Sequence, residues 1–174
     1  MSPNVAPQDR YWDSDAFLAF LRDEEGRADE CQAVIQGARE GRVRIVTSAL
    51  TLAEVVMLPG HDKLAEAAGK TIRALFANEW IVLRDVDRFI AQKAQDLVWT
   101  YRDLRPKDAI HVATALEAGV ACLDTYDKVL LSLSGKVGDP PLVIGRPGDG
   151  MQFPLAAASQ SPSVRARQTE EHED

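Results

Sequence analysis

The sequence predicts an α/β protein with three layers, in which a central parallel sheet of four to five strands lies between helices. Short apolar segments, several rich in β-branched residues, alternate along the chain with longer segments of helical periodicity, which is the pattern of βαβ units. The chain has 174 residues, of which 45% are hydrophobic and 27% charged, so it is long enough to bury one core. No apolar run approaches the ~20 residues of a membrane span, and we expect no membrane association.

The first part of the chain is expected to supply two strands and four helices. The predicted order is strand 10–13, helix 14–24, helix 27–40, strand 43–47, helix 48–58 and helix 62–78. The strand at 43–47, "VRIVT", is dominated by β-branched residues, which favour extended backbone. Gly41 and the Pro59-Gly60 pair end the second and third helices, because neither residue type continues a helix readily.

The remaining elements follow the same alternation. The predicted order is strand 80–84, helix 86–102, helix 105–118, strand 120–124, helix 127–133 and strand 141–144. From residue 146 onward the sequence is rich in Gly, Pro, Ser, Ala and charged residues without periodicity, which is typical of disorder. We therefore expect an N-terminal tail at 1–9, one domain at 10–145 and a disordered C-terminal tail at 146–174.

Charge and cysteine content restrict the function and the compartment. The net charge is −7, so the chain lacks the overall basic character of many nucleic-acid-binding proteins, and a phosphate-bearing substrate would need a local basic patch or a bound metal. Cys31 and Cys122 lie far apart in apolar segments, which indicates reduced core residues. The N-terminal "MSPNVAPQDR" has no apolar signal core, so we expect a cytoplasmic protein.

Several acidic residues stand at unusual positions, and each also has a purely structural interpretation. Asp13 follows the first strand, where it would also suit a helix N-cap. Glu54 is the only charge in the apolar segment "ALTLAEVVML", where a salt bridge to an arginine would explain it. Asp108 stands in the first turn of the apolar helix 105–118, where the helix dipole favours an acid. Asp124 and Asp127 follow the strand at 120–124, in a position that suits a turn and a helix cap.

Taken together, these acids indicate a shared site. Parallel strands present ligand sites at their carboxyl ends, so we expect Asp13, Glu54, Asp108 and the acids of the turn that holds Asp124 and Asp127 to converge. Carboxylates at about 4 Å repel by ~4 kcal/mol per pair at an effective dielectric near 20. A hard cation such as Mg²⁺ or Mn²⁺ would offset this repulsion. Such a site is suited to metal-assisted attack of water on a phosphodiester.

Four segments resemble the PIN-domain nucleases, and most closely the VapC-type toxins of type II toxin–antitoxin systems. They occur in the family's order within about 10–144: "YWDSDAFLAFL", "VTSALTLAEV", "LRPKDAIHVATAL" and "CLDTYDKVLLSL". The resemblance implies a PIN-like fold, a Mg²⁺- or Mn²⁺-dependent ribonuclease, a small antitoxin partner and a homodimer. The catalytic and metal-binding acids that it implies are Asp13, Glu54, Asp108 and Asp127, with supporting hydroxyls from Ser14 and Thr125.

Two acids depart from the family pattern. Asp124 stands where the family more often has an apolar residue, so the fourth ligand stays open between Asp124 and Asp127. Asp15 is a possible competitor of Asp13. His111, one turn after Asp108, is expected to be a packed or hydrogen-bonded neighbour and not a ligand.

Other features extend the prediction or offer alternatives. The basic residues Arg105, Lys107 and Lys128 are candidates for holding substrate phosphates. A homodimer is also suggested by the cluster of four apolar residues Phe17, Leu18, Phe20 and Leu21. Two alternatives stay open: a haloacid-dehalogenase-like phosphatase that uses the Asp13/Asp15 pair, and a catalytically silent binding protein on the PIN fold.

Overall fold

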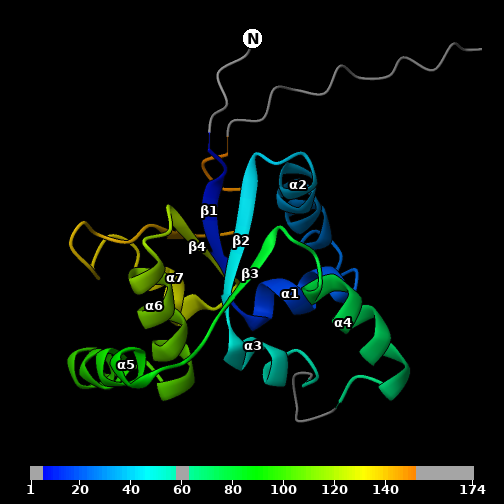
Figure 1. The fold of residues 1–174 in the computed structure, drawn as a ribbon. Helices are drawn as coiled ribbons and strands as arrows, with labels where there is room; N and C mark the ends of the chain where they lie inside the picture. The colour runs from blue at the N-terminus through cyan, green and yellow to red at the C-terminus, as the bar shows by residue number, and fades with distance from the viewer. Residues whose placement is uncertain (1–5, 58–62, 152–174) are drawn as a thin grey trace, which may run out of the picture.

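A five-stranded parallel sheet forms the centre of the protein (Figure 1). The computed structural model describes residues 6–57 and 63–151. The strands are β1 (Gln8–Trp12), β2 (Val43–Ser48), β3 (Ile81–Arg84), β4 (Cys122–Asp124) and β5 (Ile144–Gly145), in the spatial order β3-β2-β1-β4-β5. The predicted α/β class with a parallel sheet is confirmed.

Helices cover both faces of this sheet. One face carries α1 (Ser14–Leu21), α2 (Ala28–Arg39) and α4 (Gly69–Phe76), and the other carries α5 (Arg88–Thr100), α6 (Pro106–Ala118) and α7 (Lys128–Ser132) (Figure 1). The short helix α3 (Ala49–Glu54) follows β2 at the carboxyl edge of the sheet. In parallel sheets this edge collects the loops that bind ligands.

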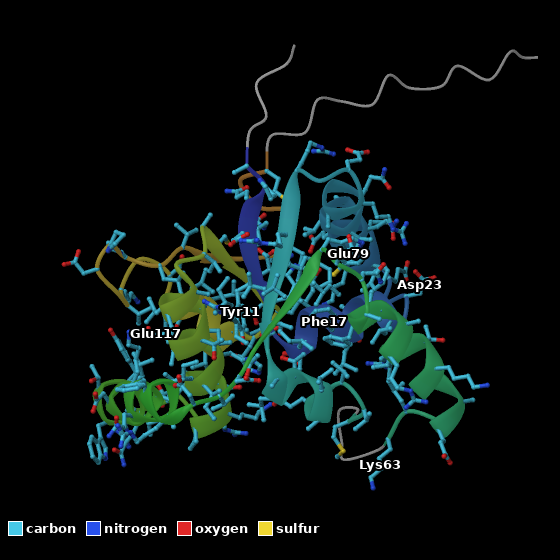
Figure 2. All side chains as sticks on the ribbon, in the orientation of Figure 1. Tyr11, Phe17, Asp23, Lys63, Glu79 and Glu117 are labelled. Atoms are coloured by element: carbon cyan, nitrogen blue, oxygen red, sulfur yellow. The ribbon has the colours of Figure 1, made fainter. Side chains whose placement is uncertain are left out.

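The alternation of side chains along β1 separates two halves of the core. Tyr11 is fully buried in the half that contains α5 and α6, whereas Trp12 is fully buried in the half that contains α1 and α2. Figure 2 shows Tyr11 and Phe17 on opposite sides of the sheet. Because β1 is the central strand, its carboxyl end places Asp13 between elements from both layers.

Several element boundaries differ from those predicted, among them those of α3, α4 and β5. α3 ends at Glu54 and does not continue to 58, because the chain turns and Met57 bridges to Lys63 in antiparallel fashion. The helix expected at 62–78 begins regularly only at Gly69, after a 3₁₀ turn (Glu66–Ala68). β5 starts at Ile144, because two prolines precede Leu142 and the Leu142 N–H is donated to the Val137 carbonyl at 2.7 Å.

The sheet begins before residue 10 and the fold extends beyond residue 145, so both predicted tails overlap the folded part of the chain. β1 starts at Gln8, so the last residues of the predicted N-terminal tail belong to the sheet. Residues 146–151 also lie against the fold: Arg10 donates to the Asp149 carbonyl at 3.1 Å, and Pro147 is buried. The rest of the predicted C-terminal tail, 152–174, lies outside the described residues.

Two further expectations concern the described part of the chain. No helix within residues 6–57 and 63–151 combines the length and apolarity needed to cross a membrane. Cys31 and Cys122 are buried free thiols, as predicted.

Candidate active site

A cavity of about 490 Å³ opens at the carboxyl edge of the sheet and is lined by acidic side chains. Its lining acids are Asp13, Asp15, Asp103, Asp108 and Asp127. They come from the start of α1, the segment before α6, the first turn of α6 and the residue before α7. The fold thus brings three of the four predicted acids to one cavity. Asp103 was not predicted, since an exposed acid in a loop has no pattern that distinguishes it.

Asp13 serves both as a helix cap and as a wall of the cavity. Its Oδ1 accepts a hydrogen bond from the Ala16 N–H at 3.0 Å, and its Oδ2 accepts one from the Thr125 hydroxyl. The same hydroxyl accepts from the Asp127 N–H at 2.9 Å. Thr125, which is fully buried, therefore fixes Asp13 relative to Asp127, so a hydroxyl at this position has a defined role.

The acids of the cavity disfavour each other's ionised form. Burial raises the pKa of Asp13 to about 7, and the neighbouring Asp15 carboxylate adds to the shift. Burial also raises the pKa of Asp15 and of Asp108, and in both cases the Asp127 carboxylate adds to the shift while the Lys107 ammonium opposes it. A cation bound among these carboxylates would relieve both the repulsion and the desolvation.

Glu54 lies beside this group and is held by other partners. Its Oε2 is 2.7 Å from His111 Nε2, and its Oε1 is 3.4 Å from Lys107 Nζ. It lines a neighbouring cavity that shares Ser14, Asp15 and Lys107 with the first. Glu54 therefore lines the neighbouring cavity and not the first one, and that all four acids surround one point stays a prediction. The partners of Glu54 are a histidine and a lysine, not the arginine of the structural interpretation.

The donor set nevertheless suits a hard divalent cation. Asp13, Asp108 and Asp127 present carboxylate oxygens to one cavity, and these are the ligands that Mg²⁺ and Mn²⁺ prefer. Among the described residues, no three His, Cys, Asp or Glu side chains are already arranged as a closed metal site. The carboxylate donors of the cavity suit the metal, but their oxygens would have to move closer together to bind it.

Asp124 is directed away from the cavity. It is fully buried and accepts hydrogen bonds from Arg10 Nε at 2.9 Å and from Trp12 Nε1 at 3.0 Å, with a second contact from the Arg10 guanidinium. Asp124 is not part of the cavity lining, whereas Asp127 is. Of the two acids left open by the sequence, the geometry favours Asp127 as the candidate ligand and gives Asp124 a structural ion pair.

Of the three basic residues predicted to hold phosphates, two line the cavity and one does not. Arg105 and Lys107 line the acidic cavity, where they could meet a phosphate, but Lys128 is exposed and lies outside the lining. Ser14 is buried and lines both neighbouring cavities.

The raised pKa of Asp13 predicts how the stability of the metal-free protein changes with pH. The unfolded chain releases this proton near the ordinary pKa of 3.8, whereas the folded chain retains it up to about 7. Over that window the folded state binds more protons, so the free energy of unfolding is expected to fall as pH rises from about 4 to about 7. Chemical unfolding in chelator across this range measures the slope.

Asp13→Asn is the matched control for that slope, because it removes the titration while preserving the shape of the side chain. The difference in slope between the wild type and Asp13→Asn isolates this group from the other carboxylates. Equal slopes in the two proteins would contradict the raised pKa.

Lys107 is predicted to act as an internal counter-ion of the acids. Its ammonium lies 3.4 Å from Glu54 Oε1 and 3.8 Å from Asp108 Oδ1, so it competes electrostatically with a metal cation. Lys107→Met should tighten Mn²⁺ binding by roughly 5-fold, which corresponds to about 1 kcal/mol of removed repulsion. Titration followed by electron paramagnetic resonance measures the affinity, with Lys128→Met as the control outside the cavity. Weaker Mn²⁺ binding by Lys107→Met would contradict the prediction.

Comparison with known proteins places this geometry in context. Residues 10–136 match the protein family described as the PIN domain. VapC20 of Mycobacterium tuberculosis, a toxin described as cleaving the sarcin–ricin loop, superposes with a TM-score of 0.54 at 16% identity, over 68% of this chain and 90% of that one. A toxin–antitoxin complex from Klebsiella pneumoniae gives a TM-score of 0.52 at 22% identity, over 77% of this chain and 99% of that one. At these identities the similarity shows a shared fold, and no curated protein matched the sequence.

Proposed function

Because the chain belongs to the PIN domain family, we propose that it is a metal-dependent ribonuclease and the toxin of a toxin–antitoxin pair. The observation that carries this proposal is the cavity in which Asp13, Asp108 and Asp127 meet at the carboxyl edge of the sheet. The two similar structures, a sarcin–ricin-loop-cleaving toxin and a toxin–antitoxin complex, support the substrate class and the biological role.

Several residues at the cavity have a part in the proposed hydrolysis. Asp13, Asp108 and Asp127 would hold Mg²⁺ or Mn²⁺, with Glu54 at the adjoining edge. The bound metal would activate a water molecule and offset charge that develops on the phosphate. Thr125 orients the Asp13 carboxylate through its hydroxyl.

The substrate backbone would meet positive charge at the rim of the cavity. Arg105 and Lys107 line the cavity and are exposed, so they can pair with phosphates of a bound strand. This local patch would compensate for the net charge of −7, which otherwise repels RNA.

The proposal is tested by incubating the purified chain with total RNA or a ribosomal RNA fragment and Mn²⁺. Cleavage that stops on chelation and returns on addition of Mn²⁺ is the expected result. Persistent cleavage in chelator would rule out the metal dependence. Mn²⁺ binding without any cleavage would favour the silent binding protein.

The phosphatase alternative gains no support from the family match. It would use Asp13 and Asp15 but would leave Glu54 and Asp108 without a role. A trapped aspartyl-phosphate at Asp13 would reverse this conclusion.

The proposed protein partners are a small antitoxin and a second copy of the chain. The apolar cluster that suggested the dimer is not free, however. Phe17 and Leu18 are buried, and Phe20 and Leu21 pack against the core. Among the described residues, the exposed large apolar side chains lie elsewhere, and they are Leu52, Val56, Leu83, Val86, Phe89, Trp99 and Val143. We propose that a dimer uses some of these residues, and a monomer in light scattering at micromolar concentration would contradict the dimer.

A further inference from the structure

A hydrogen-bonded chain of buried groups runs from the sheet to Glu54. The Ser48 N–H donates to the Tyr11 hydroxyl oxygen at 3.1 Å, the Tyr11 oxygen is 2.7 Å from His111 Nδ1, and His111 Nε2 is 2.7 Å from Glu54 Oε2. Tyr11 and His111 are 0% and 1% exposed. The chain connects β2, β1, α6 and α3, and α6 is distant in sequence from the other three elements.

The direction of the hydrogen bonds at His111 depends on its tautomer. The Ser48 amide can only donate, so the Tyr11 oxygen accepts from it. We assign the Tyr11 O–H as donor to His111 Nδ1 and place the imidazole proton on Nε2, from which it is donated to the Glu54 carboxylate.

Glu54 stands at the end of a short helix, where a hydrogen bond can fix the conformation of its side chain. It is the last residue of α3, which has only six residues, and the chain beyond it turns away. A glutamate side chain there would lose considerable rotamer freedom on binding a cation. The hydrogen bond from His111 restricts that freedom before any ligand arrives.

We infer that Tyr11 and His111 are positioning residues that hold Glu54 Oε2 and leave Oε1, which now faces Lys107, for a divalent cation. This inference rests on the metal-dependent function proposed above. Tyr11 selects the tautomer of His111, and His111 orients Glu54, so a hydroxyl inside the core controls a carboxylate at the cavity. Support from the same contacts is visible in the pKa of Glu54, which burial raises but which the His111 hydrogen bond and Lys107 together bring below its usual range.

The first test measures the tautomer directly on the metal-free full chain. Long-range proton–nitrogen NMR correlations should show the His111 proton on Nε2 in the wild type. In Tyr11→Phe, which loses only the hydroxyl, the proton should shift partly to Nδ1. A wild-type His111 protonated on Nδ1 would overturn the inference.

The second test compares Mn²⁺ affinity by electron paramagnetic resonance in two matched variants of His111. In His111→Gln the amide nitrogen falls near the Nε2 position and can still donate to Glu54, whereas the shorter amide of His111→Asn falls near Nδ1. His111→Asn and Tyr11→Phe should bind Mn²⁺ about 10-fold more weakly than the wild type, as is common when a group that orients a metal ligand is lost. His111→Gln should retain most of the affinity.

Thermal unfolding of each variant in chelator separates positioning from packing. If Tyr11 and His111 only fill the core, the variants will lose stability while Mn²⁺ affinity stays at the wild-type value, and the inference is overturned. If the wild type itself binds no Mn²⁺, the proposed function fails and this inference fails with it. If the wild type binds Mn²⁺ and cleaves RNA but the variants bind equally well, only the positioning role is lost.

Discussion

Replacing Asp108 by Asn is expected to abolish RNA cleavage and weaken Mn²⁺ binding while leaving the metal-free protein as stable as the wild type or slightly more stable. Asp108 lines the acidic cavity from the first turn of α6. Burial raises its pKa, and neighbouring carboxylates add to the shift, so its charge opposes folding when no metal is present. Asn keeps the shape but cannot supply a charged ligand, and we expect cleavage to fall by at least about 100-fold.

Asp29→Asn is the matched control for this experiment. Asp29 also stands in the first turn of a helix, α2, but it is exposed and outside the cavity. Its replacement should cost on the order of 0.5 kcal/mol through the helix dipole and leave cleavage intact. An active Asp108→Asn protein that is destabilised by the same amount would show that Asp108 is only a helix-start residue.

The order of strands and helices was predictable because it depends on local patterns. Segments such as "VRIVT" and "WIVLR" have the apolar, β-branched composition and the length typical of strands, and Pro106 and Gly119 mark the two ends of α6. Element ends were less predictable where tertiary contacts determine them. The early end of α3 depends on the bridge between Met57 and Lys63, which no periodicity reveals.

The site was predictable to the extent that each acid stood out within its own segment. Asp13 was noticeable because it follows the first strand, and Asp108 because it stands in the first turn of an apolar helix. The partners of Glu54 were not predictable, since His111 lies 57 positions away and approaches only when α6 packs on β2, the strand that leads into α3. The same limit applies to Asp124, whose partner Arg10 stands on the adjacent strand, where Arg10 is in register with Cys122.

Replacing Asp124 and Asp127 separately by Asn is expected to give opposite phenotypes. Asp124 is the counter-ion of Arg10, and both side chains are buried. Asp124→Asn leaves the guanidinium without a balancing charge, which should cost about 3 kcal/mol or more, equivalent to a fall in the melting temperature of roughly 6–12 °C for a chain of this size. Asp127→Asn should keep its stability, because the Asp127 Oδ1 caps α7 through the N–H groups of Val129 and Leu130 and Asn is an equally good cap.

The two variants should also differ in Mn²⁺ affinity and in RNA cleavage. Asp127→Asn removes a carboxylate that lines the cavity, so it should weaken Mn²⁺ binding and suppress cleavage at an unchanged melting temperature. Asp124→Asn, measured below its lowered melting temperature, should bind Mn²⁺ as the wild type does. The double variant Arg10→Met/Asp124→Asn should recover part of the lost stability, because it removes the uncompensated charge together with its partner. If Asp124→Asn instead melts like the wild type and loses Mn²⁺ binding, then Asp124 is the fourth ligand, and the buried ion pair with Arg10 is not its role.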